Sequence, residues 1–318
     1  MGAFGQDLPT SFDSALRLAA AILSRNSELI SRGVIQAEAE LLVIEAYRRS
    51  GHASLTRMEL YSRLADRFPE AAGEALIIMA GARSEGKILQ HITGKQVFLD
   101  HEYEVGPDVL VPRPETEAMV AHAVKILAEQ FDAPRSGIEI GLGSGIISIE
   151  LLSRFPSLRM ISSELTEEAA RRAGSNANRI LGSGSRGLGR LQILRAPNAL
   201  DVWGAFRSLA SEGKPRAQFL VSNPPYLAPS DPIDREVLEQ EPRTALFPPG
   251  TDPLHFYREI AGGLDEFLEP TGIVFLEIAP ERSVEARALF ARYDRDVRVY
   301  SDLNGRDRFI EVRMGFVP

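Results

Sequence analysis

The feature that most constrains the fold is a regular alternation of short apolar runs with helical stretches beyond residue 135. Five runs read GIEIG, LRMISS, LQILR, AQFLVS and GIVFLEI, and segments such as ISIELLSRF and DPLHFYREIAGGLDEFL separate them. Strands and helices in alternation predict a doubly wound, mostly parallel α/β sheet. Two more β-like segments, DVRVYSDL and RDRFIEVRM, would complete seven strands with a closing hairpin.

The N-terminal part of the chain has a different pattern, because its apolar residues recur at helical spacing. SALRLAAAILSR, AEAELLVIEAYRR and PEAAGEALIIMAGARSEG are each typical of a helix, and no strand signal interrupts them. Further on, QVFLD and EYEVG are short segments rich in β-formers that predict a hairpin. We therefore expect a helical domain over 1–86, a linker with a β-hairpin over 87–112 and the α/β domain over 113–318.

Composition argues against several classes of protein. The 318 residues include no cysteine, and the five histidines never lie three or four positions apart, so we expect no metal site. A net charge of −8 argues against stable nucleic-acid binding. The N-terminus lacks a basic start before an apolar run, and no stretch approaches the ~18 apolar residues of a membrane span. We expect a cytoplasmic protein that does not enter a membrane.

A glycine-rich turn, EIGLGSG, lies between a predicted strand and a predicted helix. Gly141, Gly143 and Gly145 would let backbone N–H groups approach a ligand with no Cβ in the way. Glu164 ends the next predicted strand, where a carboxylate accepts hydrogen bonds from ribose hydroxyls. Glu139 would direct a second carboxylate at the turn, which suits a positively charged ligand such as S-adenosylmethionine. The alternative is a tight turn that binds nothing.

An unusual tetrapeptide, Asn223-Pro224-Pro225-Tyr226, follows the fourth predicted strand. Because ligands bind outside the carboxyl ends of strands in open α/β sheets, it would share a crevice with the glycine turn. The prolines stiffen the loop and leave carbonyl oxygens without local donors. A rigid turn at the end of a strand is the alternative interpretation.

These residue types suit an acceptor that carries a planar NH2 group. One N–H could reach the Asn223 side-chain oxygen and the other the Pro224 carbonyl, which would turn the nitrogen lone pair toward an activated methyl group. Tyr226 could stack on the flat group that bears the NH2. No general base is strictly needed, because the nitrogen becomes strongly acidic once it is methylated. The tetrapeptide therefore predicts an N-methyltransferase.

Four segments together, NPPY, EIGLGSG, VPRPETE and EPRTALF, resemble the release-factor glutamine N5-methyltransferases, also called peptide-chain-release-factor methyltransferases. The resemblance covers most of the chain. It implies a class I S-adenosylmethionine-dependent methyltransferase fold, joined by a hairpin to a small helical domain that docks the substrate. It also implies that the enzyme methylates the side-chain amide nitrogen of a glutamine in peptide chain release factors.

The resemblance also implies a set of site residues. Cofactor contacts are expected at Glu139, Gly141, Leu142, Gly143, Ser144, Gly145, Glu164 and Asn223. The glutamine amide is expected at Asn223, Pro224, Pro225 and Tyr226, and the pocket is expected to include Arg113, Pro114 and Glu115. VPRPETE is also typical of a helix start with proline in the first turn.

Several positions depart from the family pattern. The family usually has aspartate where Glu139 and Glu164 stand, and an acidic residue near the adenine where this chain has Pro197-Asn198. Asn198 could hydrogen-bond the adenine instead. The segments LQHITGK and LEIAP also differ from the usual pattern. These departures concern the substrate more than the fold.

Three other functions remain open. A small-molecule amide or guanidine, such as that of a free amino acid, would need the same chemistry. The adenine of DNA presents a similar NH2 group, but residues 1–85 have nine arginines, no lysine and eleven acidic residues, a net charge of −2 that suits DNA poorly. A protein that only binds the cofactor would have no use for the tetrapeptide.

Overall fold

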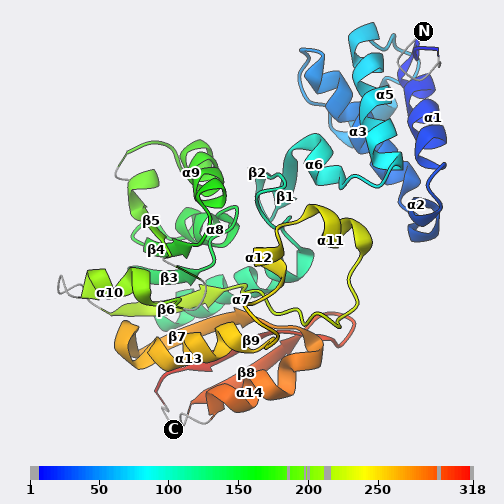
Figure 1. The fold of residues 1–318 in the computed structure, drawn as a ribbon. Helices are drawn as coiled ribbons and strands as arrows, with labels where there is room; N and C mark the ends of the chain where they lie inside the picture. The colour runs from blue at the N-terminus through cyan, green and yellow to red at the C-terminus, as the bar shows by residue number, and fades with distance from the viewer. Residues whose placement is uncertain are drawn as a thin grey trace. The chain divides into compact units, whose positions relative to one another are not determined.

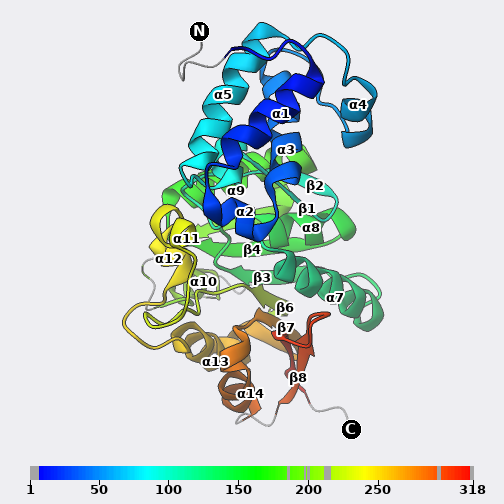
Figure 2. The same ribbon diagram turned by 90° about the vertical axis from the view of Figure 1, so that its right-hand side faces the viewer.

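The computed structural model describes the chain in six stretches: residues 7–184, 187–196, 198, 201–210, 216–291 and 295–315. The chain divides into two compact units. One consists of Met1–Gly94 with Asp234–Gln240, and the other of Lys95–Ile233 with Glu241–Pro318. Figure 1 labels most of their helices and strands, and Figure 2 labels α4. No helix in the described stretches is long and apolar enough to cross a membrane.

The first unit is a helical bundle around a single apolar core. Its N-terminal helices are α1 (Phe12–Leu23), α2 (Ser27–Arg32), α3 (Ile35–Arg49), α4 (Arg57–Ser62), α5 (Glu70–Ser84) and α6 (Leu89–Thr93). Side-chain caps begin three of them, since Ser11, Asn26 and Thr56 accept hydrogen bonds from first-turn N–H groups. α1, α3 and α5 pack on one another and bury residues such as Leu42 and Leu76.

The helical unit extends beyond the expected 1–86 in two ways. α6 belongs to it because Leu89 and Ile92 are buried in its core, which moves the boundary to Gly94. The distant helix α11 (Arg235–Gln240) belongs to it as well. Its Glu236 carboxylate pairs with Arg83 of α5 at 2.6 Å, a contact between positions that are remote in the chain.

The expected hairpin is present as β1 (Lys95–Phe98) and β2 (His101–Glu104), which pair antiparallel. It belongs to the second unit, so the segment 87–112 is divided rather than a separate linker. Phe98 and Tyr103 are buried in the core of that unit. The Tyr103 hydroxyl also donates a hydrogen bond to Glu150 at 2.9 Å.

The second unit contains a seven-stranded sheet, which confirms the predicted doubly wound α/β class. Its strands are β3 (Ser136–Ile140), β4 (Arg159–Glu164), β5 (Leu191–Arg195), β6 (Ala217–Ser222), β7 (Leu268–Glu277), β8 (Asp296–Ser301) and β9 (Asp307–Arg313). The spatial order is β5-β4-β3-β6-β7-β9-β8. β3 to β7 pair in parallel, and β9 lies antiparallel to both β7 and β8 as the closing hairpin.

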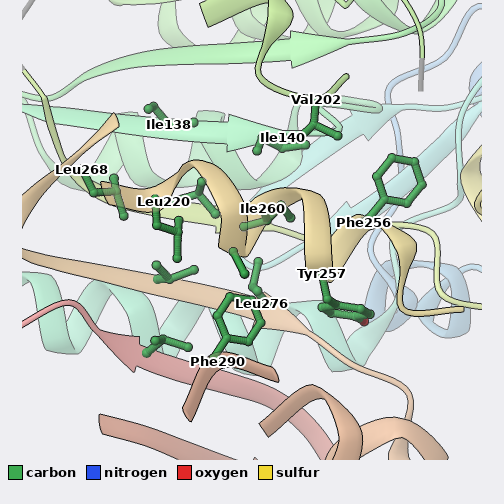
Figure 3. Close-up of a cluster of buried hydrophobic side chains, with 14 of the residues drawn as sticks. Ile138, Ile140, Val202, Leu220, Phe256, Tyr257, Ile260, Leu268, Leu276 and Phe290 are labelled. Atoms are coloured by element: carbon green, nitrogen blue, oxygen red, sulfur yellow. The ribbon is translucent and has the colours of Figure 1, made fainter. Parts of the chain in front are cut away.

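Helices cover both faces of this sheet (Figure 2). One face is covered by α7 (Pro114–Gln130), α8 (Ile146–Arg154) and α9 (Glu167–Leu181), and the other by α10 (Gly204–Ala210), α13 (His255–Phe267) and α14 (Ser283–Ala291). Figure 3 shows the second core, where Ile260 and Tyr257 of α13 lie over Leu220 and Leu276 of the sheet. A short helix, α12 (Arg243–Leu246), follows α11 in the chain.

Candidate active site

The candidate site lies where the strand order reverses, between β3 and β6. The glycine turn follows β3 and the tetrapeptide follows β6, and the Ser222 hydroxyl donates to the Ile140 carbonyl at 2.6 Å to hold these two strand ends together. A pocket of about 150 Å³ that opens to solvent is lined by both segments. Carboxyl ends of neighbouring strands at such a reversal are where α/β sheets bind ligands.

The three glycines of the turn have positive φ, but they serve two different purposes. φ is 80° at Gly141, 56° at Gly143 and 86° at Gly145, a region that other residues rarely adopt. A Cβ placed on Gly141 or Gly143 would meet no atom of the described chain within 4 Å. A Cβ on Gly145 would lie 3.0 Å from Ile149 and 3.1 Å from Ala173. Gly143 therefore keeps space open beside the pocket, whereas Gly145 allows close helix packing.

Glu164, at the end of β4, is held by backbone N–H groups and lines the pocket. Its two carboxylate oxygens accept from Gly143 N–H and Thr166 N–H, both at 2.9 Å. A carboxylate oxygen can accept more than one hydrogen bond, so the group retains acceptor capacity for a ligand's hydroxyls. Leu142 and Ser144 of the turn line the same pocket.

Glu139 is buried, and its carboxylate contacts Ser148 in the first turn of α8. It accepts a hydrogen bond from Ser148 N–H at 3.1 Å and another from the Ser148 hydroxyl. Burial, with a smaller contribution from the nearby Glu164 carboxylate, raises the pKa of Glu139 to about 8, although the hydrogen bonds from Ser148 oppose the rise. Because Glu139 also lines the pocket, a bound cation would favour its ionised form.

The tetrapeptide places its residues in two directions. Asn223, Pro224 and Pro225 line the pocket. Tyr226 is not among the described residues that line the pocket. Its ring packs against the core instead, and its hydroxyl donates to Glu277 at 3.2 Å. Burial raises the pKa of the Tyr226 hydroxyl, and the Glu277 carboxylate adds to the effect. The expected stacking of this ring on an acceptor has no counterpart in this arrangement.

VPRPETE and EPRTALF meet at the pocket through an ion pair. Arg113 lines the pocket and binds the buried Glu241 carboxylate at 2.6 Å. Pro114 and Glu115, which we expected in the pocket, are absent from its described lining. Pro114 begins α7, and Glu115 instead pairs with Arg308 at 3.2 Å.

Of the two residues expected near the adenine, Asn198 lines the pocket, whereas Pro197 lies outside the described residues. Thr116 and Glu277 are among the residues around the site that were not anticipated. Thr116 lines the pocket and bonds to both Asn223 and Glu277. Glu277 ends the apolar strand β7, and an acidic residue at the end of a buried strand is the same signal that pointed to Glu164. That signal could have identified Glu277, and Thr116 lies within VPRPETE, directly after the residues that were expected in the pocket.

The chain is similar in sequence to known release factor glutamine methyltransferases. No family model matches the chain. A release factor glutamine methyltransferase of Bacteroides thetaiotaomicron is 35% identical over 231 residues, covering 70% of this chain and 74% of that protein. One from Cereibacter sphaeroides is 32% identical over 304 residues, covering 94% and 99%. The solved release factor-specific protein-(glutamine-N5) methyltransferase of Alicyclobacillus acidocaldarius is 24% identical with a TM-score of 0.41, covering 67% of this chain and 99% of that one.

Proposed function

The chain belongs to the release factor glutamine methyltransferases, and we propose that it methylates the side-chain amide nitrogen, N5, of a glutamine in peptide chain release factors. One observation carries the proposal within this molecule. Asn223 and Pro224 line the same pocket as the glycine turn and Glu164, so acceptor-binding and cofactor-binding groups converge at one place. Because release factors act in translation, we expect the protein to work in the cytoplasm.

S-adenosylmethionine is the cofactor that we propose for this pocket. The open space beside Gly143, the Glu164 carboxylate and the enclosed Glu139 fit a ligand with ribose hydroxyls and a positive charge. Asn198 lines the pocket and would contact the adenine. When bound, this cofactor supplies an electrophilic methyl group.

The acceptor amide would be held by Asn223 and Pro224. Its two N–H groups would donate to the Asn223 side-chain oxygen and to the Pro224 carbonyl, which proline leaves without a local donor. Such donation orients the amide nitrogen and favours its lone pair over delocalisation into the carbonyl. The nitrogen then loses a proton as it gains the methyl group, so the site needs no strong base.

We propose that the helical unit docks the release factor. A pocket of this size contacts only a few residues of a folded protein, so further affinity must come from another surface. Met58 and Ile78, at 83% and 60% exposure, are large apolar side chains presented by this unit. The chain between Tyr226 and Glu241 contributes α11 to the unit, so the acceptor loop is joined to it covalently.

The test is methyl transfer from labelled S-adenosylmethionine to purified release factors, duplex DNA, free glutamine and free arginine in parallel. Label on a release factor glutamine is the expected result. Asn223→Ala should raise the activation free energy by about 2 to 4 kcal/mol while cofactor affinity stays within a few-fold. Asn304→Ala, in an exposed turn, is the matched control with unchanged turnover. Label only in DNA, or only in a free amino acid, would overturn the proposal.

A further inference from the structure

We infer that Glu277, acting through Thr116, determines which end of the Asn223 side-chain amide faces the methyl acceptor. Glu277 is thus a positioning residue for the reaction. The inference rests on the proposed function, because it concerns the oxygen that would accept from the substrate amide. It concerns three residues that come from different elements: the end of β7, the first turn of α7 and the loop after β6.

A chain of hydrogen bonds connects the three side chains. Asn223 Nδ2 donates to Thr116 Oγ1 at 3.3 Å. Thr116 Oγ1 in turn donates to Glu277 Oε2 at 2.6 Å. Thr116 is 1% exposed and Glu277 3% exposed, so water does not compete for these contacts.

The donor and acceptor in each of these hydrogen bonds follow from counting protons. A hydroxyl has a single proton, and Thr116 gives it to the Glu277 carboxylate, which can only accept. The Thr116 oxygen must therefore accept from Asn223, and only the NH2 end of that amide can donate. The Asn223 oxygen is thereby directed away from Thr116, toward the side where an acceptor NH2 would need it.

Neutralising Glu277 would remove this constraint. A protonated carboxyl group can donate to Thr116, which frees the threonine proton to donate to Asn223. The asparagine amide could then turn over and present its NH2 group to the substrate NH2 group. Two donors facing one another cannot form the hydrogen bond that orients the acceptor.

Groups from several elements face Glu277 and set its charge. The Tyr226 hydroxyl donates to its other carboxylate oxygen, and the Tyr257 hydroxyl of α13 donates to its backbone carbonyl at 2.8 Å. Burial raises the pKa of Glu277 to about 7, and hydrogen bonds from Thr116 and Tyr226 oppose that rise. Glu115 of α7 raises the pKa and Arg308 of β9 lowers it. The carboxylate form, and with it the fixed asparagine, prevails above neutral pH.

The first test compares Thr116→Val, which keeps the shape and removes the hydroxyl, with Thr116→Ser, which keeps the hydroxyl. We expect Thr116→Val to lower kcat by ~10- to 100-fold, as losses of orienting partners do elsewhere, and Thr116→Ser to restore most of it. Cofactor affinity and Tm of both variants check the fold. Full turnover by a folded Thr116→Val variant would overturn the inference.

A double-mutant cycle separates positioning from general structural damage. If Thr116 acts through Asn223, Thr116→Val should have no further effect on kcat in the Asn223→Ala background. An equal loss in both backgrounds would contradict the inference. Wild-type kcat should also fall as pH drops through about 7, with Glu277→Gln low at every pH and lacking this acidic limb.

A third measurement needs no turnover, so it keeps this inference distinct from the choice of substrate. The Asn223 side-chain NH2 resonances, assigned by their disappearance in Asn223→Ala, report the bond to Thr116 directly. We expect their protons to exchange faster with water in Thr116→Val and Glu277→Gln than in Thr116→Ser. Unchanged exchange in both would overturn the inference, whereas a wild type that methylates no release factor would overturn only the proposed function.

Discussion

The guanidinium of Arg83 and the carboxylate of Glu236 form a 2.6 Å ion pair although 153 positions separate them in the chain. Arg83 also binds both oxygens of Glu38, at 2.7 and 3.0 Å, and donates to the Lys87 carbonyl. Arg32 joins the same cluster through Glu236. This network holds α11 within the helical unit.

Removing the central cation should be strongly destabilising. Arg83→Ala leaves Glu38 enclosed without its main partner, so we expect a loss of about 3 to 5 kcal/mol in the free energy of unfolding. Arg17→Ala is the control, because Arg17 pairs with Asp13 at an exposed position and should change stability by less than about 1 kcal/mol. Denaturant titration measures both, and equal effects would show that the network does not hold the unit together.

Gly143→Val should abolish cofactor binding while the protein still folds. The side chain would enter the open space beside the pocket, at a φ of 56° that valine rarely adopts. Gly305→Val is a matched control, since Gly305 has a φ of 74° and equally open surroundings on the turn between β8 and β9. Calorimetry should find normal cofactor affinity in the control alone. Unchanged affinity in Gly143→Val would contradict the role of the turn.

Cofactor affinity should increase with pH because of Glu139. Burial raises the pKa of this carboxyl group to about 8, so it is largely protonated below that pH in the free protein. A bound sulfonium favours the ionised form, hence affinity should rise from about pH 6 and level off above about pH 8. Glu139→Gln should flatten the profile. A wild-type dissociation constant that does not vary over this range would argue against a cation beside Glu139.

A change on the helical unit should affect a protein substrate more than a peptide. We expect Met58→Lys combined with Ile78→Lys to raise the Michaelis constant for a whole release factor about tenfold, roughly 1.4 kcal/mol, and to leave that for a short glutamine peptide unchanged. Val284→Lys, at a 78% exposed position of the second unit, is the control. Surface changes are preferable to deletion of the helices, because deletion would remove the partners of α11. Parallel effects on both substrates would disprove docking.

Much of the fold followed from local pattern. The alternation of apolar and helical segments predicted a seven-stranded α/β sheet, and the strand order places the glycine turn beside the tetrapeptide. The sheet could be predicted because the periodicity of apolar residues can be read from the sequence. The site could be predicted because ligands bind at the carboxyl ends of strands, and the sequence shows which residues follow each strand. The residues Gly143, Glu164 and Asn223 could be chosen for the pocket from the sequence for this reason.

Other features depend on contacts between distant positions. The attachment of α11, the turn of Tyr226 toward Glu277 and the pairing of Glu115 with Arg308 each join side chains at least 51 positions apart. Thr116 reaches Asn223 only because the first turn of α7 and the loop after β6 meet in the folded unit. The sequence by itself determined the layered sheet and the order of its functional turns. Tertiary packing decided which side chains contact one another, because a buried polar group that lacks a hydrogen-bond partner costs free energy and only one arrangement supplies these partners.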